Sequence, residues 1–276
     1  MNYAGSTESA AQRVKRNIAR AKASLRNKEY LKAILEAKLA FESRPDCQGL
    51  FGQPRVEIDF MLEEFCTTFS ANPGILELLN RFRIGHKPFI AYTKGNVEEI
   101  ITKLDIFATR LTDHLQEREN LQKVQHERDK KYWLTKGRHC LQRGELPLGR
   151  SHLRRAAEQF GHEDGVLVEI AEMLLEKNLL GDAAELLAQA RELFPSDQRP
   201  YTLGVRAHME QAEWDKAEEI YLTALKVFGN HAITLLNLAR LYMTWNKRDK
   251  AWEYARMALD KNPNLEEAQA IMNKAE

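Results

Sequence analysis

A period of 34 residues in the second half of the sequence constrains the fold of this chain more than any other feature. Alanine recurs at this spacing in two series, which are Ala183, Ala217 and Ala251, and Ala156, Ala190, Ala224 and Ala258. Residues that end helices recur with the same period, at Gly161, Pro195, Gly229 and Pro263. A period of this length indicates stacked supersecondary units, none of which can bury its apolar side chains alone.

Each period carries the pattern of two amphipathic helices. In residues 164–197, the apolar residues of the first helix follow i, i+3, i+4, i+7 spacing at Leu167, Ile170, Ala171 and Leu174. After a polar break a second apolar face begins at Ala183, and Pro195 ends that helix. Small residues are expected where two helix axes cross closely, and large ones are expected to fill the gaps between successive pairs.

A helix–turn–helix unit of 34 residues with this alternation resembles the tetratricopeptide repeat. The resemblance extends one unit upstream, on Trp133, Gly137, Gly144, Ala156 and Gly161. It implies four tandem repeats, which span residues 130–163, 164–197, 198–231 and 232–265. A capping helix is predicted over 266–276, with Asn264 and Glu267 spaced as a capping box.

The first half, residues 1–129, is predicted to be an irregular helical region. A hairpin similar to one repeat is expected at 9–45, followed by helices at about 55–70, 73–82 and 96–129. Residues 116–131 contain only two apolar side chains, Leu121 and Val124, and form either a solvated helix or a hinge. The absence of Gly and Pro there favours the helix. No strand-like alternation occurs, so the predicted fold class is all-α, an α-solenoid of repeats preceded by irregular helices.

Three cysteines, Cys47, Cys66 and Cys140, form no paired motif and are expected to be buried thiols in a reducing compartment. The sequence has no apolar run long enough for a membrane span and no signal-peptide pattern near its first residue. The expected location is therefore the cytoplasm.

Residues with catalytic spacing are missing from the sequence. Its eight histidines form no HExxH motif and no zinc-binding pattern with cysteine, and no glycine-rich phosphate loop occurs. His208 falls on the apolar face of its helix, where a packed histidine is the expected role. We therefore expect neither an enzyme nor a bound metal or cofactor.

The resemblance implies that the first helix of each repeat lines a concave groove that holds a peptide or a helix of another protein. The residues expected on the exposed face of these helices are Leu134, Arg138, Leu141, Val168, Glu172, Leu175, Thr202, Arg206, Met209, Leu236, Asn237, Arg240 and Met243. They form a row of Arg138, Glu172, Arg206 and Arg240 beside an apolar row of Leu141, Leu175, Met209 and Met243. An apolar row beside guanidinium groups predicts a partner that is acidic and hydrophobic. The alternative is that Arg206 and Arg240 pair with Glu172 and Glu210 and only keep the groove soluble.

Members of the family that bind chaperones hold a C-terminal carboxylate with Lys, Asn and Arg on successive first helices. Here those positions carry Leu134, Arg138, Glu169, Arg199 and Leu203. The pattern fails, so a carboxylate-clamp co-chaperone is not expected.

Charge is distributed unevenly along the chain. Residues 11–38 contain nine Lys or Arg against two acidic residues. Repeat 130–163 carries eight basic and three acidic side chains, whereas repeat 164–197 carries two and eight. The basic stretch 11–38 could contact nucleic acid, an acidic partner or a membrane surface, or could be a solvated helix face. With Tyr30 as its only aromatic residue, it lacks a stacking platform, so nucleic-acid binding is not expected.

These observations predict a non-enzymatic adaptor or scaffold that binds a partner peptide or helix in the groove of the repeats. One alternative is a scaffold that self-assembles into a homo-oligomer through the apolar-rich residues 46–95. The other is a nucleic-acid-associated regulator that uses the basic helix.

Overall fold

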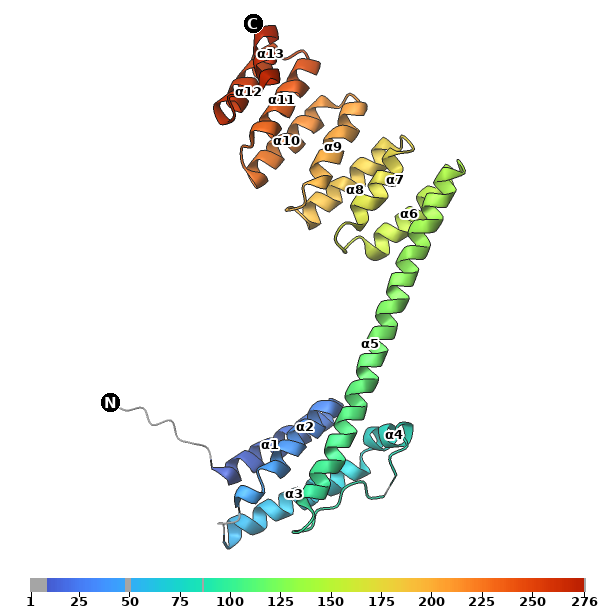
Figure 1. Ribbon diagram of the computed structural model, residues 1–276. Helices are drawn as coiled ribbons and strands as arrows, with labels where there is room; N and C mark the ends of the chain where they lie inside the picture. Colours follow the sequence, from blue (N-terminus) through green and yellow to red (C-terminus); the bar gives the residue numbers. More distant parts are fainter. Residues whose placement is uncertain (1–8, 48–50, 86, 276) are drawn as a thin grey trace, which may run out of the picture. The chain divides into compact units, whose positions relative to one another are not determined.

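The computed structural model describes residues 9–47, 51–85 and 87–275, and all regular secondary structure in these ranges is helical, which confirms the all-α prediction (Figure 1). The chain divides into two compact units, one ending at Lys123 and the other beginning at Val124. Among the described residues, no helix combines the length and the apolar character that crossing a bilayer requires. All three cysteines are buried and free, and burial raises the pKa of the Cys66 thiol to about 12.

The helices of the first unit are α1 (Ala10–Arg26), α2 (Tyr30–Glu42), the short η1 (Pro45–Cys47), α3 (Gln53–Ala71), α4 (Pro73–Arg81) and the first part of α5 (Val97–Gln142). Helix α1 starts with a capping box. The backbone N–H of Gln12 donates to Ser9 Oγ, and the backbone N–H of Ser9 donates to Oε1 of the Gln12 side chain. The Asn72 side chain caps α4 by accepting from the amides of Gly74 and Ile75. Helices α1 and α2 pack against each other as the predicted hairpin.

A polar cluster around the buried Arg44 side chain joins three separate segments of the first unit. Arg44 donates from Nη2 and Nε to Asp59 Oδ1 at 2.6 and 3.0 Å, and the Tyr92 hydroxyl donates to the same oxygen at 2.6 Å. Burial alone would raise the pKa of Asp59, but the hydrogen bonds from Tyr92 and Arg44 outweigh it and hold that pKa below its ordinary value. The cluster ties α3 to the turn between α2 and η1 and to the segment before α5.

The second unit begins within α5 and continues with α6 (Leu146–Phe160), α7 (Val166–Leu175), α8 (Leu180–Leu193), α9 (Arg199–Glu210), α10 (Trp214–Phe228), α11 (Ala232–Thr244), α12 (Arg248–Lys261) and α13 (Glu266–Ala275). From α6 onward, consecutive helices pack against each other in chain order (Figure 1). Two helices fall within each predicted repeat. The end of α5 and α6 occupy 130–163, α7 and α8 occupy 164–197, α9 and α10 occupy 198–231, and α11 and α12 occupy 232–265.

The turn inside each repeat has the same backbone conformation at the same position. Four residues spaced by one period have positive φ, namely Gly144 (80°), Asn178 (57°), Ala212 (56°) and Asn246 (59°). Lys28, between α1 and α2, also has a positive φ of 61°. The left-handed conformation lets the chain reverse direction within a few residues, and Gly and Asn tolerate it best. The period therefore fixes a turn geometry as well as a set of packed side chains.

Small residues lie where the two helices of a repeat cross, as the sequence predicts. The alanines of both periodic series are buried. In the first repeat the crossing uses glycine, because a Cβ added at Gly137 would lie 2.4 Å from Leu153 Cδ2, and one at Gly149 would lie 2.6 Å from Leu141 Cδ2. Gly149 therefore stands where alanine is usual because this crossing has no room for a methyl group.

Gly149→Ala is expected to destabilise the second unit by about 1–3 kcal/mol through overpacking against Leu141, despite the better helix propensity of alanine. Gly181→Ala is the matched control, since nothing lies within 4 Å of a Cβ added at that α8 residue. The control should raise stability, by up to about 1 kcal/mol. Urea denaturation followed by tryptophan fluorescence measures both changes, and equal stabilisation by the two alanines would contradict the packing described here.

Helix α13 covers the last repeat but does not begin with the predicted capping box. Ala268 and Ile271 are buried in one cluster with Leu235, Tyr242 and Ala251. The Asn264 amide donates to the Asn262 side chain, and the Glu267 carboxylate accepts from Arg240. The guanidinium of Arg240 holds Glu267, so that carboxylate does not reach back to the Asn264 amide.

Candidate functional site

The residues expected to line the groove divide into three groups by exposure. Here "first-helix face" denotes the solvent-exposed side of α7, α9, α11 and the last turns of α5. Five of the predicted residues are exposed, and these are Arg138, Glu172, Thr202, Arg206 and Arg240. Three are half-buried, and these are Met209, Asn237 and Met243. The other five are buried, and for Leu134, Leu141, Val168, Leu175 and Leu236 the predicted exposure is wrong.

The predicted apolar row is displaced by one residue along each first helix. The row that lies beside the charged residues and is exposed is Gln142, Glu176, Glu210 and Thr244. Each of these follows by one position a residue of the predicted apolar row, and one position turns the side chain by about 100°. Leu141 and Leu175 belong to the core between the helices. The exposed first-helix face is consequently more polar than predicted.

Each arginine of this face has a carboxylate partner. Arg138 pairs with Glu169 at 2.9 Å, and Arg206 pairs with Glu210 at 2.8 Å. Arg240 donates to Asn237 Oδ1 at 2.7 Å and to Glu267 of α13. From the sequence, ion pairing within the groove is the alternative to partner binding, and the pair of Arg206 with Glu210 agrees with that alternative. Arg240 instead pairs with a residue outside the predicted groove.

Two carboxylates on the same face stand without an ion pair. Glu172 and Glu176 are both exposed on α7, and neither forms an ion pair or a side-chain hydrogen bond with any residue that the structure describes. Once the paired groups are set aside, the available charge on this part of the first-helix face is negative.

A cavity of about 390 Å³ opens between α9, α10 and α11. We call it the first-helix cavity. Its apolar wall consists of Tyr201, Val205, Ile220, Tyr221, Ala224, Phe228 and Ile233, and its polar groups are Gln198, Thr202, His231, Thr234 and Asn237. Apart from His231, none of these side chains is ionisable near neutral pH. An apolar cavity with a few amide and hydroxyl groups can hold an apolar side chain and fix its orientation.

The aromatic side chains of the cavity are held in place by their own contacts. The Tyr201 hydroxyl donates to the Pro195 carbonyl at 3.2 Å, and the Phe228 ring meets the Tyr201 ring edge-on with their centres 5.2 Å apart. Burial raises the pKa of Tyr221, partly opposed by the nearby Arg240. The wall is therefore largely formed before any ligand arrives.

Only Thr202 and Asn237 of the predicted residues line this cavity. The turn between α10 and α11 uses Gly229 with φ of 90°, where the preceding repeat has Pro195. Two features of repeat 198–231 could have indicated the cavity from the sequence. They are the glycine in this turn and the three aromatic residues Tyr201, Tyr221 and Phe228. Of these residues, only Gly229 is used in the sequence-based prediction, as a residue that ends a helix.

The basic stretch of α1 and α2 is largely engaged within the first unit. Arg13 pairs with Asp46, Lys15 with Glu57, Lys22 with Glu64, Lys32 with Glu29, and Lys38 with Asp105. Two of these pairs, those of Lys15 and Lys22, join α1 to α3. The stretch thus contributes to helix packing and offers less free positive charge than its composition indicates.

The described ranges contain no group of three or more His, Cys, Asp or Glu side chains placed to hold a metal ion.

Comparison with known proteins gives a family model described as tetratricopeptide repeat, which matches residues 134–198 and 202–266. Among solved structures, the MamA protein is 16% identical, with a TM-score of 0.42, over 53% of this chain and 80% of that one. The C-terminal part of a TPR repeat-containing protein from Cytophaga hutchinsonii is 13% identical, with a TM-score of 0.41, over 92% of this chain and 99% of that one. The TPR2AB domain of yeast Sti1, in a complex with pHSP90, is 15% identical, with a TM-score of 0.35, over 95% of this chain and 98% of that one. No curated protein matches.

The two family matches begin at residues 134 and 202, two 34-residue periods apart, in the register that the turns and crossings share. Residues 134–266 of this chain are therefore tandem tetratricopeptide repeats.

Proposed function

We propose that the repeats bind a segment of a partner protein on the first-helix face, and that an apolar side chain of this segment enters the first-helix cavity. The cavity carries this proposal, since it combines an aromatic wall with uncharged polar groups on the face that the family resemblance assigns to binding. Aromatic side chains held in place before binding lose little conformational freedom in the complex. The role is that of a protein-binding scaffold.

The charges of the first-helix face favour a basic segment where it passes α7. An acidic segment was expected from three arginines, but Arg138, Arg206 and Arg240 each have a carboxylate partner. The unpaired carboxylates of Glu172 and Glu176 would meet Lys or Arg side chains of the partner. The proposed partner segment is thus apolar at the cavity and basic beside α7.

Ile233→Glu in the full chain tests this function. Ile233 lines the cavity and is 57% exposed, so a charge there should leave the fold intact while opposing entry of an apolar side chain. Val227→Glu is the matched control, because Val227 is an exposed aliphatic residue of α10 outside the cavity. A partner isolated from native lysate with the wild-type chain should bind Ile233→Glu about tenfold more weakly or worse and bind Val227→Glu normally.

Equal binding of that partner to the wild-type chain and to Ile233→Glu would reject the cavity as the anchoring site. Glu172→Lys with Glu176→Lys tests the charge preference separately, since a basic segment should bind this variant more weakly while an acidic one should bind it more tightly.

Self-association is a second candidate, favoured by exposed apolar side chains in the first unit. Phe51, Val56 and Phe60 are 80%, 67% and 64% exposed. Val56 and Phe60 lie one turn apart on the same face of α3, and such a patch is typical of an interaction surface. Sedimentation of the wild-type chain and of Phe60→Glu tests it, since a monomer at all concentrations would reject self-assembly.

A further inference from the structure

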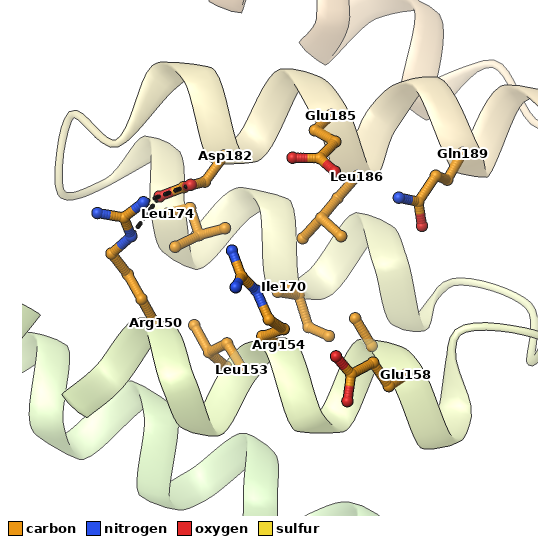
Figure 2. Close-up of a pocket in the computed structure, with 11 residues that line it drawn as sticks. Arg150, Leu153, Arg154, Glu158, Ile170, Leu174, Asp182, Glu185, Leu186 and Gln189 are labelled. Atoms are coloured by element: carbon orange, nitrogen blue, oxygen red, sulfur yellow. Dashed lines mark hydrogen bonds and ion pairs between the residues drawn. The ribbon is translucent and has the colours of Figure 1, made fainter. Parts of the chain in front are cut away.

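A second cleft lies on the other side of the repeats. Helices α6, α7 and α8 enclose a volume of about 220 Å³, which we call the second-helix cleft (Figure 2). Its floor includes Ile170 and Leu174 of α7. Ile170 is two positions from Glu172 of the first-helix face, which places the two side chains about 200° apart on the helix. The cleft and the first-helix face therefore open in opposite directions.

The floor of the second-helix cleft is apolar. It is formed by Leu153, Ala157, Ile170, Leu174 and Leu186. Leu153, Ile170 and Leu174 are themselves buried, so the floor is a fixed surface and not a set of mobile side chains. The space above it is large enough for a bulky aliphatic side chain.

At two successive turns, the facing walls of the cleft carry opposite charges. Helix α6 contributes Arg150 and Arg154, and α8 contributes Asp182 and Glu185 (Figure 2). At one end the walls neutralise each other, because Arg150 donates to the Asp182 carboxylate at 2.6 and 2.7 Å. This pair closes that end of the cleft.

One turn further along, the walls do not meet. Arg154 extends from α6 toward α8, and Glu185 faces the same space from α8 (Figure 2). Neither side chain forms an ion pair or a hydrogen bond with any described residue, and the same holds for Glu158 beyond Arg154 on α6. An occupant of this cleft must therefore place an apolar group on the floor and groups of opposite charge beside the guanidinium and the carboxylates.

We propose that the second-helix cleft binds an amphipathic helix of a partner protein, with a bulky apolar residue flanked by an acidic residue on the edge that faces α6 and by a basic residue on the edge that faces α8. The apolar residue contacts Ile170 and Leu186, the acidic residue pairs with Arg154, and the basic residue pairs with Glu185. The opposite charges of Arg154 and Glu185 across the cleft select a helix whose edges are charged in the complementary order. The site is separate from the first-helix cavity, so the chain can hold two partners on opposite sides of its repeats.

A synthetic peptide serves as the probe. It is a helix of about 14 residues, roughly four turns, with a leucine stripe bordered by Glu on one edge and by Lys on the other. The comparison peptide has the same composition, with Glu and Lys alternating along both edges. Fluorescence anisotropy with the full chain should show saturable binding of the probe and weaker binding of the comparison peptide.

Arg154→Glu and Glu185→Lys should each weaken binding of the probe about tenfold or more, because each places a like charge against one edge of the helix. Glu219→Lys is the matched control, since Glu219 occupies on α10 the position that Glu185 occupies on α8, one period earlier, and lies outside the cleft. Both substituted side chains are exposed, and circular dichroism checks that the helices remain. Arg154→Gln provides a milder variant that should also weaken binding if Arg154→Glu disturbs the fold.

Failure of the probe to bind the wild-type chain would overturn the proposal, as would equal binding of both peptides. Binding that Arg154→Glu and Glu185→Lys leave unchanged would do the same. Ile233→Glu separates this site from the first-helix cavity: the probe should bind that variant normally, and loss of binding would place the probe on the other face.

Discussion

Asp59→Ala is expected to lower the free energy of unfolding of the first unit by about 3–5 kcal/mol, the cost of removing one partner of a buried ion pair. The Arg44 and Asp59 side chains are 9% and 15% exposed. Without the carboxylate, the Arg44 guanidinium and the Tyr92 hydroxyl lose a shared acceptor inside the protein. The link between α3, the turn after α2 and the segment before α5 would be lost with it.

The two units can be measured separately in one denaturation experiment. All four tryptophans, Trp133, Trp214, Trp245 and Trp252, lie in the second unit. Tryptophan fluorescence therefore follows the second unit, whereas circular dichroism follows both. Asp59→Ala should shift the unfolding transition of the first unit, which only circular dichroism detects, and should leave the fluorescence transition of the second unit unchanged.

Asp46→Ala is the control for this substitution, because it removes an exposed ion pair with Arg13 at 2.8 Å and should cost about 0–1 kcal/mol. Equal losses in the two variants would contradict the role assigned to burial. The pH dependence follows from the lowered pKa of Asp59. The stabilisation is fully present above the unfolded-state pKa, about 3.9, and is lost as the pH falls through the lower folded-state pKa. In Asp59→Ala this acid-dependent loss should disappear.

Deletion of residues 264–276 is expected to destabilise the second unit by on the order of 4 kcal/mol, from the apolar contacts that α13 makes with the last repeat. Ala268 and Ile271 pack into the same cluster as Leu235, Tyr242 and Ala251. Their removal leaves an apolar surface exposed at the end of the stack, which should also promote self-association.

Truncation after Met272 is the control for this deletion, since it keeps Ala268 and Ile271 and removes the exposed Asn273 and Lys274. Tryptophan fluorescence and light scattering measure the two effects. A deletion variant as stable and as monomeric as the wild-type chain would show that α13 does not act as a cap.

The repeat architecture can be predicted from the sequence because several physical requirements share one period. Close helix crossings require small side chains such as Ala217 and Ala251, and the turns require residues such as Gly144 and Asn178 that tolerate positive φ. Each requirement marks the same register independently. The family match agrees with that register.

The candidate site is less predictable because a period shows which residues are equivalent without showing which side of the helix faces solvent. The sequence pattern predicts that Leu141 and Leu175 are exposed, whereas the exposed residues are their neighbours Gln142 and Glu176. This difference of one residue replaces an apolar row by a polar one. The first-helix cavity forms where α9, α10 and α11 meet beside Gly229. The periodicity of one helix does not show how three helices are arranged.

Interactions between distant residues explain the remaining differences. Glu267 pairs with Arg240 of α11, where local spacing indicates a capping box with Asn264. The cluster of Arg44, Asp59 and Tyr92 joins α3 to two connecting segments, and no local motif marks it.

Hydrogen–deuterium exchange of the full chain, with and without the partner isolated from native lysate, tests binding in the first-helix cavity most directly. The proposed function predicts slower exchange in α9, in α11 and in the turn at Gly229 when the partner is bound. Slower exchange confined to α6 and α8, or to the first unit, would contradict it.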